Sequence, residues 1–246
     1  MENVYDNAGF FEQYKEMRSQ EINANNLIEN PIIKEMLPDL AGKTILDLGC
    51  GDGNMGHYFL QNGAKSVLGV DISENMLCLA KQNNTNPNMD FALLKMEDIS
   101  SLNQKFDLIY SSLAFHYVQD INKLFADIHN LLNPNGMLLF SQESPLVTAS
   151  IFESENPEKK LNINGKQYFL LSDYGNESVR NNYWNGVPVT KYHRTYATMT
   201  MALLNNKFKI VDIKDSFATE QTIKMYEKYK NQKDRPYFTF FKATKI

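Results

Sequence analysis

Three aspartates stand around a glycine-rich turn, and their charge limits which ligands the turn can bind. Residues 44–53 are TILDLGCGDG and residues 67–73 are VLGVDIS. Asp47 precedes the first glycine, Asp52 lies inside the turn, and Asp71 ends the second apolar stretch. At an effective dielectric constant of about 20, two like unit charges about 4 Å apart repel by roughly 4 kcal/mol. The turn therefore favours a positively charged ligand without phosphate groups.

The same turn contains a formal match to the dinucleotide-binding fingerprint. Residues 51–56 are GDGNMG and satisfy G-x-G-x-x-G. The match is displaced, because the apolar stretch meets its first glycine at Gly49, and Asp47 and Asp52 oppose a pyrophosphate at the helix N-terminus. S-adenosylmethionine, which carries a ribose, a sulfonium and an ammonium group, suits the turn better.

Several motifs follow in the order found in one enzyme family. They are residues 44–53, 67–73, 96–99 (MEDI), 106–118 (FDLIYSSLAFHYV) and 131–140 (LLNPNGMLLF). Together, over residues 43–142, they closely resemble the class I S-adenosylmethionine-dependent methyltransferases.

The resemblance implies a cofactor, S-adenosylmethionine, and a set of residues that bind it. The turn glycines, Gly53 included, would let the backbone approach the methionine part of the cofactor. Asp71 would bind both ribose hydroxyls, and Asp98 the adenine amine. The full expected set is Asp47, Gly49, Cys50, Gly51, Asp71, Ile72, Met76, Glu97, Asp98, Ile99, Ser111, Ser112 and His116.

His116 and Tyr117 follow the fourth predicted strand, where open α/β sheets bind their ligands. A histidine there is a candidate general base, since its ordinary pKa of about 6.5 suits proton transfer near neutral pH. Tyr117 is expected to contact the acceptor. The alternative is that His116 only packs in the pocket wall or touches the cofactor.

Two further segments resemble a subgroup of bacterial small-molecule methyltransferases. Residues 191–195, KYHRT, place His193 as a second candidate catalytic residue and Arg194 as a candidate substrate contact; a hinge held by a salt bridge is the alternative. Near the N-terminus, Tyr14 and Arg18 fit the subgroup's pattern as cofactor-binding residues. Arg18 would hold the cofactor carboxylate, and a solvated helical arginine is the competing interpretation.

The segment 143–193 breaks the regular pattern and is rich in Asn, Ser, Gly and aromatic residues. Trp184, with its aromatic neighbours, is a candidate contact for an apolar or planar acceptor. Ordinary packing of a lid would require similar residues, so the identity of the acceptor does not follow from the sequence.

Composition and charge exclude several classes of protein. The formal net charge is -4 with no dense basic run, so nucleic acid is not an expected partner. No signal peptide and no membrane-length apolar run is present, which predicts a cytoplasmic protein without membrane association. No His, Cys, Asp or Glu spacing is typical of a metal site, and no catalytic metal is expected. Cys50 and Cys78 are expected to be reduced thiols, the second packed within a helix.

Alternating apolar strands and amphipathic helices predict an α/β fold. It is a doubly wound, mostly parallel seven-stranded sheet with helices on both faces, an antiparallel edge pair at the C-terminus and an inserted lid. The single domain 1–246 divides into an N-terminal helical cap (1–40), a cofactor-binding core (43–142), the lid (143–193) and a C-terminal helix with edge strands (194–246). Predicted strands are 44–48, 66–71, 90–94, 106–111, 136–142, 208–217 and 237–243, and predicted helices after the cap are 54–62, 74–82, 122–132, 195–206 and 220–230.

The sequence therefore predicts transfer of a methyl group from S-adenosylmethionine to a small organic acceptor by in-line displacement. Alignment of the reactants would be the main contribution of the protein, worth about 7 to 11 kcal/mol. Two alternatives stay open: a protein or carrier-bound acceptor, and a regulator that binds the cofactor without turnover. The oligomeric state does not follow from the sequence.

Overall fold

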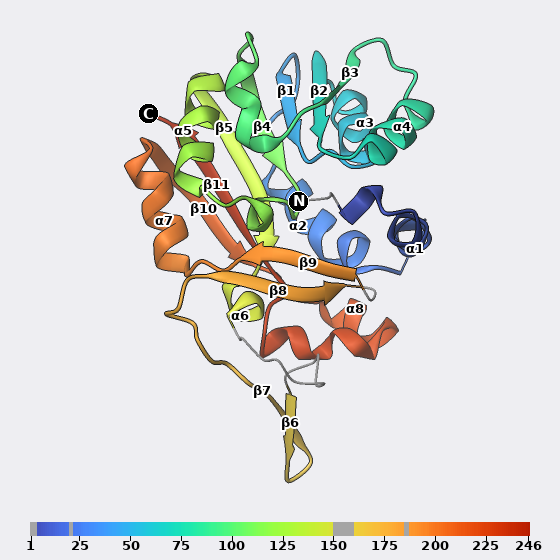
Figure 1. The fold of residues 1–246 in the computed structure, drawn as a ribbon, viewed down its shortest axis with the longest axis vertical. Helices are drawn as coiled ribbons and strands as arrows, with labels where there is room; N and C mark the ends of the chain where they lie inside the picture. The colour runs from blue at the N-terminus through green and yellow to red at the C-terminus, as the bar shows by residue number, and fades with distance from the viewer. Residues whose placement is uncertain (1–3, 20–21, 150–159, 185–186) are drawn as a thin grey trace.

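A seven-stranded sheet organises the protein (Figure 1). The computed structural model describes residues 4–19, 22–149, 160–184 and 187–246. The strand order is β10-β11-β5-β4-β1-β2-β3. The strands are β1 (Thr44–Leu48), β2 (Ser66–Asp71), β3 (Met89–Leu93), β4 (Phe106–Ser111), β5 (Leu132–Glu143), β10 (Phe208–Asp215) and β11 (Phe238–Lys245). Strands β1 to β5 are parallel, whereas β11 runs antiparallel to both β5 and β10. The predicted sheet and its antiparallel C-terminal pair are confirmed.

Helices cover both faces of the sheet, which is why its central strands are apolar on both sides. Ile45 packs with α2 (Asn30–Met36) and α3 (Asn54–Gln61) on one face. Leu46, the next residue, packs with α5 (Ile121–Leu131) and α7 (Tyr196–Asn205) on the other. Both side chains are completely buried. The helix α4 (Glu74–Asn83) packs against β2 and β3.

Most predicted element bounds agree with the structure, and the largest differences lie near the C-terminal half. Strand β5 begins at Leu132 rather than at Gly136. The helix predicted over 220–230 is the short α8 (Glu220–Met225), followed by the 3-10 helix η5 (Glu227–Lys233). No helix among the described residues is both long and apolar enough to span a bilayer.

The N-terminal cap begins with η1 (Val4–Asp6) and α1 (Ala8–Ser19), and the π-helical turn η2 (Asn25–Glu29) then leads into α2. Asp6 ties the cap to the core, because its Oδ1 accepts a hydrogen bond of 2.6 Å from the hydroxyl of Ser73. Ser73 in turn caps α4, because its hydroxyl accepts a hydrogen bond from the backbone N–H of Met76. The cap is thus anchored at the end of β2, beside the glycine turn.

The segment predicted as a lid contains α6 (Pro145–Thr148) and two β-hairpins. The first is β6 (Lys160–Ile163) with β7 (Lys166–Phe169), and the second is β8 (Val179–Trp184) with β9 (Val187–Tyr192). Figure 1 shows the second hairpin crossing the sheet at the end of β5. Its strand β9 contacts both η1 and the 3-10 helix η4 (Phe115–Tyr117). The hairpin therefore joins the N-terminal cap to the loop that follows β4.

Arg180 on β8 holds the inserted segment together from inside. Its side chain is buried, and its guanidinium donates to the carbonyls of Thr148 and Ala149 at the end of α6. It also donates to the carbonyl of Asn176 at 2.8 Å and to the hydroxyl of Ser178. Five N–H donors in a fixed fork are needed for this arrangement, and only arginine provides them.

Replacing Arg180 by lysine should loosen the insert without unfolding the sheet. Lysine retains the charge and loses about two of these hydrogen bonds, each worth roughly 1 kcal/mol, so local opening should become more frequent by about tenfold or more. Limited proteolysis with mass mapping would report faster cleavage within residues 143–193. Arg194→Lys is the control, since Arg194 donates instead to the carbonyls of Val118 and Gln119. Equal cleavage of the insert in both variants would contradict the assignment.

Candidate active site

The glycine turn after β1 requires backbone conformations that other residues rarely adopt. Gly49, Gly51 and Gly53 have φ angles of 71°, 55° and 76°. The backbone N–H groups of Gly49 and Cys50 both donate to the carbonyl of Val70, at 2.8 and 3.0 Å. These hydrogen bonds hold the turn against the end of β2. A Cβ at Gly49 would lie 2.9 Å from the Cβ of Ala114. Both the φ angle and the close approach exclude a side chain at this position.

Asp71 ends β2 with its carboxylate directed at the same turn. Its Oδ2 accepts from the backbone of Gly51 and its Oδ1 from the backbone of Ser73, each at 2.9 Å. Burial raises the pKa of Asp71, and the hydrogen bonds from Ser73 and Gly51 oppose that rise. The group lies where two backbone donors and the turn meet, as expected for a residue that contacts a ribose.

Asp47 is the most unusual group in the site. The side chain is 1% exposed, and its Oδ2 has no hydrogen-bond partner among the described residues. Burial, followed by the charges of Asp71 and Asp52, raises the pKa of Asp47 to about 8. A buried carboxyl oxygen without a donor is costly, and a cationic ligand would relieve that cost. The ammonium and sulfonium groups of S-adenosylmethionine fit this requirement.

Two hydrophobic side chains follow Asp71 closely in the chain. Ile72 is 43% exposed although its side chain is hydrophobic, and Met76 is buried with its Cε close to Gly51. Glu97 and Asp98 are exposed at the start of the 3-10 helix η3 (Met96–Ser101).

Cys50 and Ile99 are two residues of the expected cofactor-binding set whose side chains face the protein interior. Cys50 is a buried thiol, and Ile99 is completely buried in the core, so Ile99 could contribute only backbone atoms to a ligand. Cys78, expected to pack within its helix, is instead exposed on α4.

The two serines after β4 direct their hydroxyls into the protein. Ser111 donates to the carbonyl of Leu48, and Ser112 donates to Glu29 at 2.6 Å. Side-chain contacts from these serines to a cofactor therefore have no support here. Glu29 was missed by the sequence analysis, although a charged residue among the apolar positions of the cap was a usable signal.

His116 is a poor proton acceptor in this structure. Its ring is 4% exposed, and its Nδ1 accepts a long hydrogen bond of 3.4 Å from the backbone of Glu143. Burial lowers the pKa of His116 to about 4, while the nearby Glu143 raises it and Lys191 lowers it. The ring is neutral near pH 7, and the hydrogen bond places the remaining proton on Nε2. Proton abstraction by His116 therefore has no support in this structure.

His193 has neither ring nitrogen available for a substrate. Its Nδ1 lies 2.8 Å from the hydroxyl of Thr148 and its Nε2 lies 3.0 Å from the carbonyl of Tyr174. Burial lowers the pKa of His193. His193 thus holds parts of the insert together, whereas Arg194 donates to the loop after η4, as described above. The structure therefore does not support the expected catalytic role of His193 or the expected substrate contact of Arg194.

Three expected contacts cannot be assessed. Tyr14 and Arg18 lie on α1, and Trp184 ends β8, but their side chains fall outside the described part of the chain.

A partly buried ion pair that the sequence analysis missed lies beside His116. Lys191 on β9 places its Nζ 2.6 Å from Oε1 of Glu143 at the end of β5. The same Nζ lies 5.8 Å from the ring centroid of Tyr117, whose ring centroid is 4.2 Å from that of His116. Because the partners are separated by 48 positions, no local pattern could reveal the pair.

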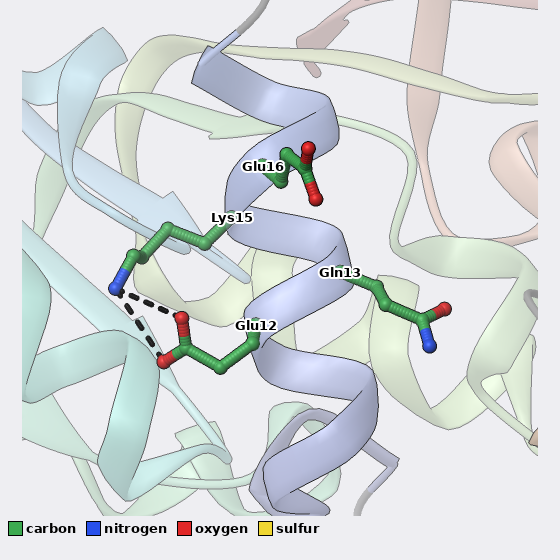
Figure 2. Close-up of a pocket in the computed structure, with 4 residues that line it drawn as sticks. All are labelled: Glu12, Gln13, Lys15 and Glu16. Atoms are coloured by element: carbon green, nitrogen blue, oxygen red, sulfur yellow. Dashed lines mark hydrogen bonds and ion pairs between the residues drawn. The ribbon is translucent and has the colours of Figure 1, made fainter.

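A shallow surface depression lies along α1. Figure 2 shows it lined by Glu12, Gln13, Lys15 and Glu16, with Lys15 paired to Glu12 at 3.3 Å. All four residues are exposed on one helix. Among the residues that the structure describes, no group of three His, Cys, Asp or Glu side chains is arranged to hold a metal ion.

Comparison with known proteins agrees with the geometry. The family described as "Methyltransferase domain" matches residues 45–136. A solved S-adenosylmethionine-dependent methyltransferase from Mesorhizobium loti is 31% identical with a TM-score of 0.80, covering 92% of this chain and 99% of that one. An uncharacterised protein of Haemophilus influenzae is 37% identical over 99% of this chain and 97% of its own length. A malonyl-[acyl-carrier protein] O-methyltransferase of Hamiltonella defensa subsp. Acyrthosiphon pisum is 32% identical over 44% of this chain and 40% of its own length.

The fold and the site define an α/β transferase that binds an adenosine cofactor at the carboxyl ends of its strands. The chain belongs to the S-adenosylmethionine-dependent methyltransferases, and S-adenosylmethionine is its cofactor.

Proposed function

We propose that this chain transfers a methyl group from S-adenosylmethionine to a small organic acceptor beside His116 and Tyr117. The observation that carries the proposal is the buried Oδ2 of Asp47 beside the glycine turn, for which the described part of the chain offers no hydrogen-bond partner. When bound, S-adenosylmethionine supplies a methyl group on a sulfonium, which departs as a neutral thioether.

The glycine turn and the residues around it have separate proposed roles in binding the cofactor. Asp71 binds the ribose hydroxyls, while Ile72 and Met76 pack against the adenine and Asp98 accepts from its amine. Asp47 and the backbone of the turn from Gly49 to Gly51 bind the amino-acid end. This division follows from the burial and exposure of the side chains, since Ile72 is exposed and Asp47 is enclosed.

The chain's main contribution to the reaction is alignment of the acceptor and exclusion of water. The hairpin β8–β9 contacts both η1 and η4, and Lys191 joins it to Glu143 on β5. A closed, dry site preserves the orientation that gives the effective molarity of an intramolecular reaction. Because the Nδ1 of His116 is engaged, its Nε2–H is suited to orient an acceptor oxygen.

A carrier-bound acceptor is the second candidate. The Hamiltonella relative is named for such a substrate. In this chain, residues 224–235 contain five cationic side chains and two carboxylates, although the whole chain is acidic. Asn231 within this stretch donates to Gln167 of the first hairpin at 2.7 Å, which places the positive charge beside the insert. A negatively charged carrier protein would be attracted to this surface.

Incubation with radiolabelled S-adenosylmethionine and a cell extract, followed by separation by size, distinguishes these functions. We expect label in a small-molecule fraction, and an Asp71→Ala variant as control should abolish it. Label confined to protein would support a carrier-bound or protein acceptor. Binding of the cofactor measured by calorimetry, with no label in any fraction, would instead indicate a regulator.

A further inference from the structure

Glu29 is a completely buried carboxylate at the junction of three separate segments. It ends η2 of the N-terminal cap and is 0% exposed. Its Oε1 accepts from the hydroxyls of Ser112 and Ser141, at 2.6 and 2.5 Å, and its Oε2 accepts from Nδ2 of Asn25 at 2.6 Å. All three partners are uncharged donors. Burial of a carboxylate is costly, so these hydrogen bonds must all be present for the arrangement to persist.

The serines bound by Glu29 also control the backbone after β4. The N–H of Leu113 donates to both the carbonyl and the hydroxyl of Ser141, at 3.1 and 3.0 Å. Leu113 has a φ angle of 50°, in the left-handed region that residues with a Cβ rarely adopt. Such a conformation persists only where the surroundings enforce it. Glu29 fixes the hydroxyl that helps to enforce it.

The enforced turn leads directly to the cofactor site. Ala114, the next residue, lies so close to Gly49 that a Cβ added at Gly49 would be 2.9 Å from the Cβ of Ala114. The following helix η4 carries His116 and Tyr117. A shift at Leu113 would therefore move the wall against which the glycine turn rests, while Asp71 and Ile72 are held separately at the end of β2.

We propose that Glu29 is a positioning residue that locks the N-terminal cap onto the turn Ser112–Leu113–Ala114 and thereby shapes the subsite for the amino-acid end of the cofactor. The inference rests on the proposed placement of that end at Gly49, and it is independent of the acceptor.

Two ligands allow the amino-acid subsite and the adenosine subsite to be tested separately. S-adenosylhomocysteine contains both parts, whereas 5′-methylthioadenosine lacks the amino-acid part. For Glu29→Gln and Ser112→Ala, calorimetry should show that the affinity for S-adenosylhomocysteine falls about tenfold. This is the effect expected when one hydrogen bond that positions the site is lost. Binding of 5′-methylthioadenosine should stay within about twofold of the wild type, because the strand-end residues are untouched.

Ser216→Ala is the matched control. Ser216 is also a fully buried serine, and it donates to Gln232 at 2.9 Å and accepts from the backbone of Phe238, away from the glycine turn. This variant should lower the thermal stability and leave the affinities for both ligands unchanged. Hydrogen exchange should accelerate at residues 113–116 in Glu29→Gln and not in Ser216→Ala.

The outcomes separate the failure of this inference from the failure of the proposed function. Wild-type protein that binds neither ligand would overturn the proposed cofactor site. If the wild type binds both ligands, the Glu29→Gln variant tests the positioning role alone. Equal losses of affinity for the two ligands, or no loss for either, would overturn that role. Ser112→Ala provides the same comparison if Glu29→Gln does not fold.

Discussion

Replacing Asp47 by asparagine is expected to stabilise the ligand-free protein while weakening its affinity for S-adenosylmethionine. In the folded protein the pKa of Asp47 is raised from 3.8 to about 8, chiefly by burial. The folded state therefore retains a proton that the unfolded chain releases, and stability falls as the pH rises from about 4 to about 8. Asparagine does not ionise and removes this loss.

The gain in stability should depend on pH in a defined direction. Near pH 8 we expect the Asp47→Asn variant to be more stable by about 2 kcal/mol, because the buried amide recovers only part of the ionisation cost. For a chain of this size that corresponds to roughly 4 to 8 °C in melting temperature. Near pH 5 the advantage should shrink, since most wild-type Asp47 is then protonated in the folded protein. Thermal unfolding at both pH values tests the sign.

The same variant should bind S-adenosylmethionine about 10 to 100 times more weakly, because it loses a charged partner for the cofactor's cationic groups. Asp52→Asn is the comparison, since it also removes one carboxylate from the turn, but Asp52 is partly exposed and accepts from Asn54, so its loss should weaken binding by much less. A variant that is less stable than the wild type near pH 8, or that binds the cofactor equally well, would contradict the role assigned to Asp47.

The second large effect is expected for Gly49→Ala. Alanine at position 49 would have to adopt a left-handed φ of 71°, and its Cβ would lie 2.9 Å from the Cβ of Ala114. Backbone strain costs about 1 to 3 kcal/mol, and displacement of the turn adds to it. We expect a loss of about 3 kcal/mol in stability and a decrease of more than about 100-fold in the affinity for S-adenosylhomocysteine.

Gly42→Ala isolates the contribution of the backbone. Gly42 has a φ of 70°, and a Cβ there would meet nothing within 4 Å. This variant should lose about 1 to 2 kcal/mol and bind S-adenosylhomocysteine normally. Chemical denaturation and calorimetry on both variants give the comparison. Equal losses of stability and equal affinities would show that the contact between Gly49 and Ala114 is unimportant.

The sequence was sufficient to predict the sheet because the signals for its strands are local. Strands β1, β2 and β4 have the predicted bounds, since each is a short, mostly apolar run that is followed by a glycine or ends at an aspartate or serine. The insert carried no comparable signal. The hairpin β8–β9 is held to α6 by Arg180, whose partners Thr148 and Ala149 lie 32 and 31 positions earlier in the chain. The short helix α8 is followed by a 3-10 helix whose Tyr229 packs into the core.

The class of cofactor follows from the sequence alone, because the residues that select it are close together in the chain. Gly49 must follow Asp47, and Asp71 must end the next strand, for one turn to bind a cationic adenosine compound. Only the tertiary structure decided what the remaining groups do. Burial makes His116 a weak base, the partners of His193 occupy both its nitrogens, and Glu29 meets Ser112 across 83 positions. Protonation and hydrogen bonding depend on long-range packing, which spacing along the chain does not encode.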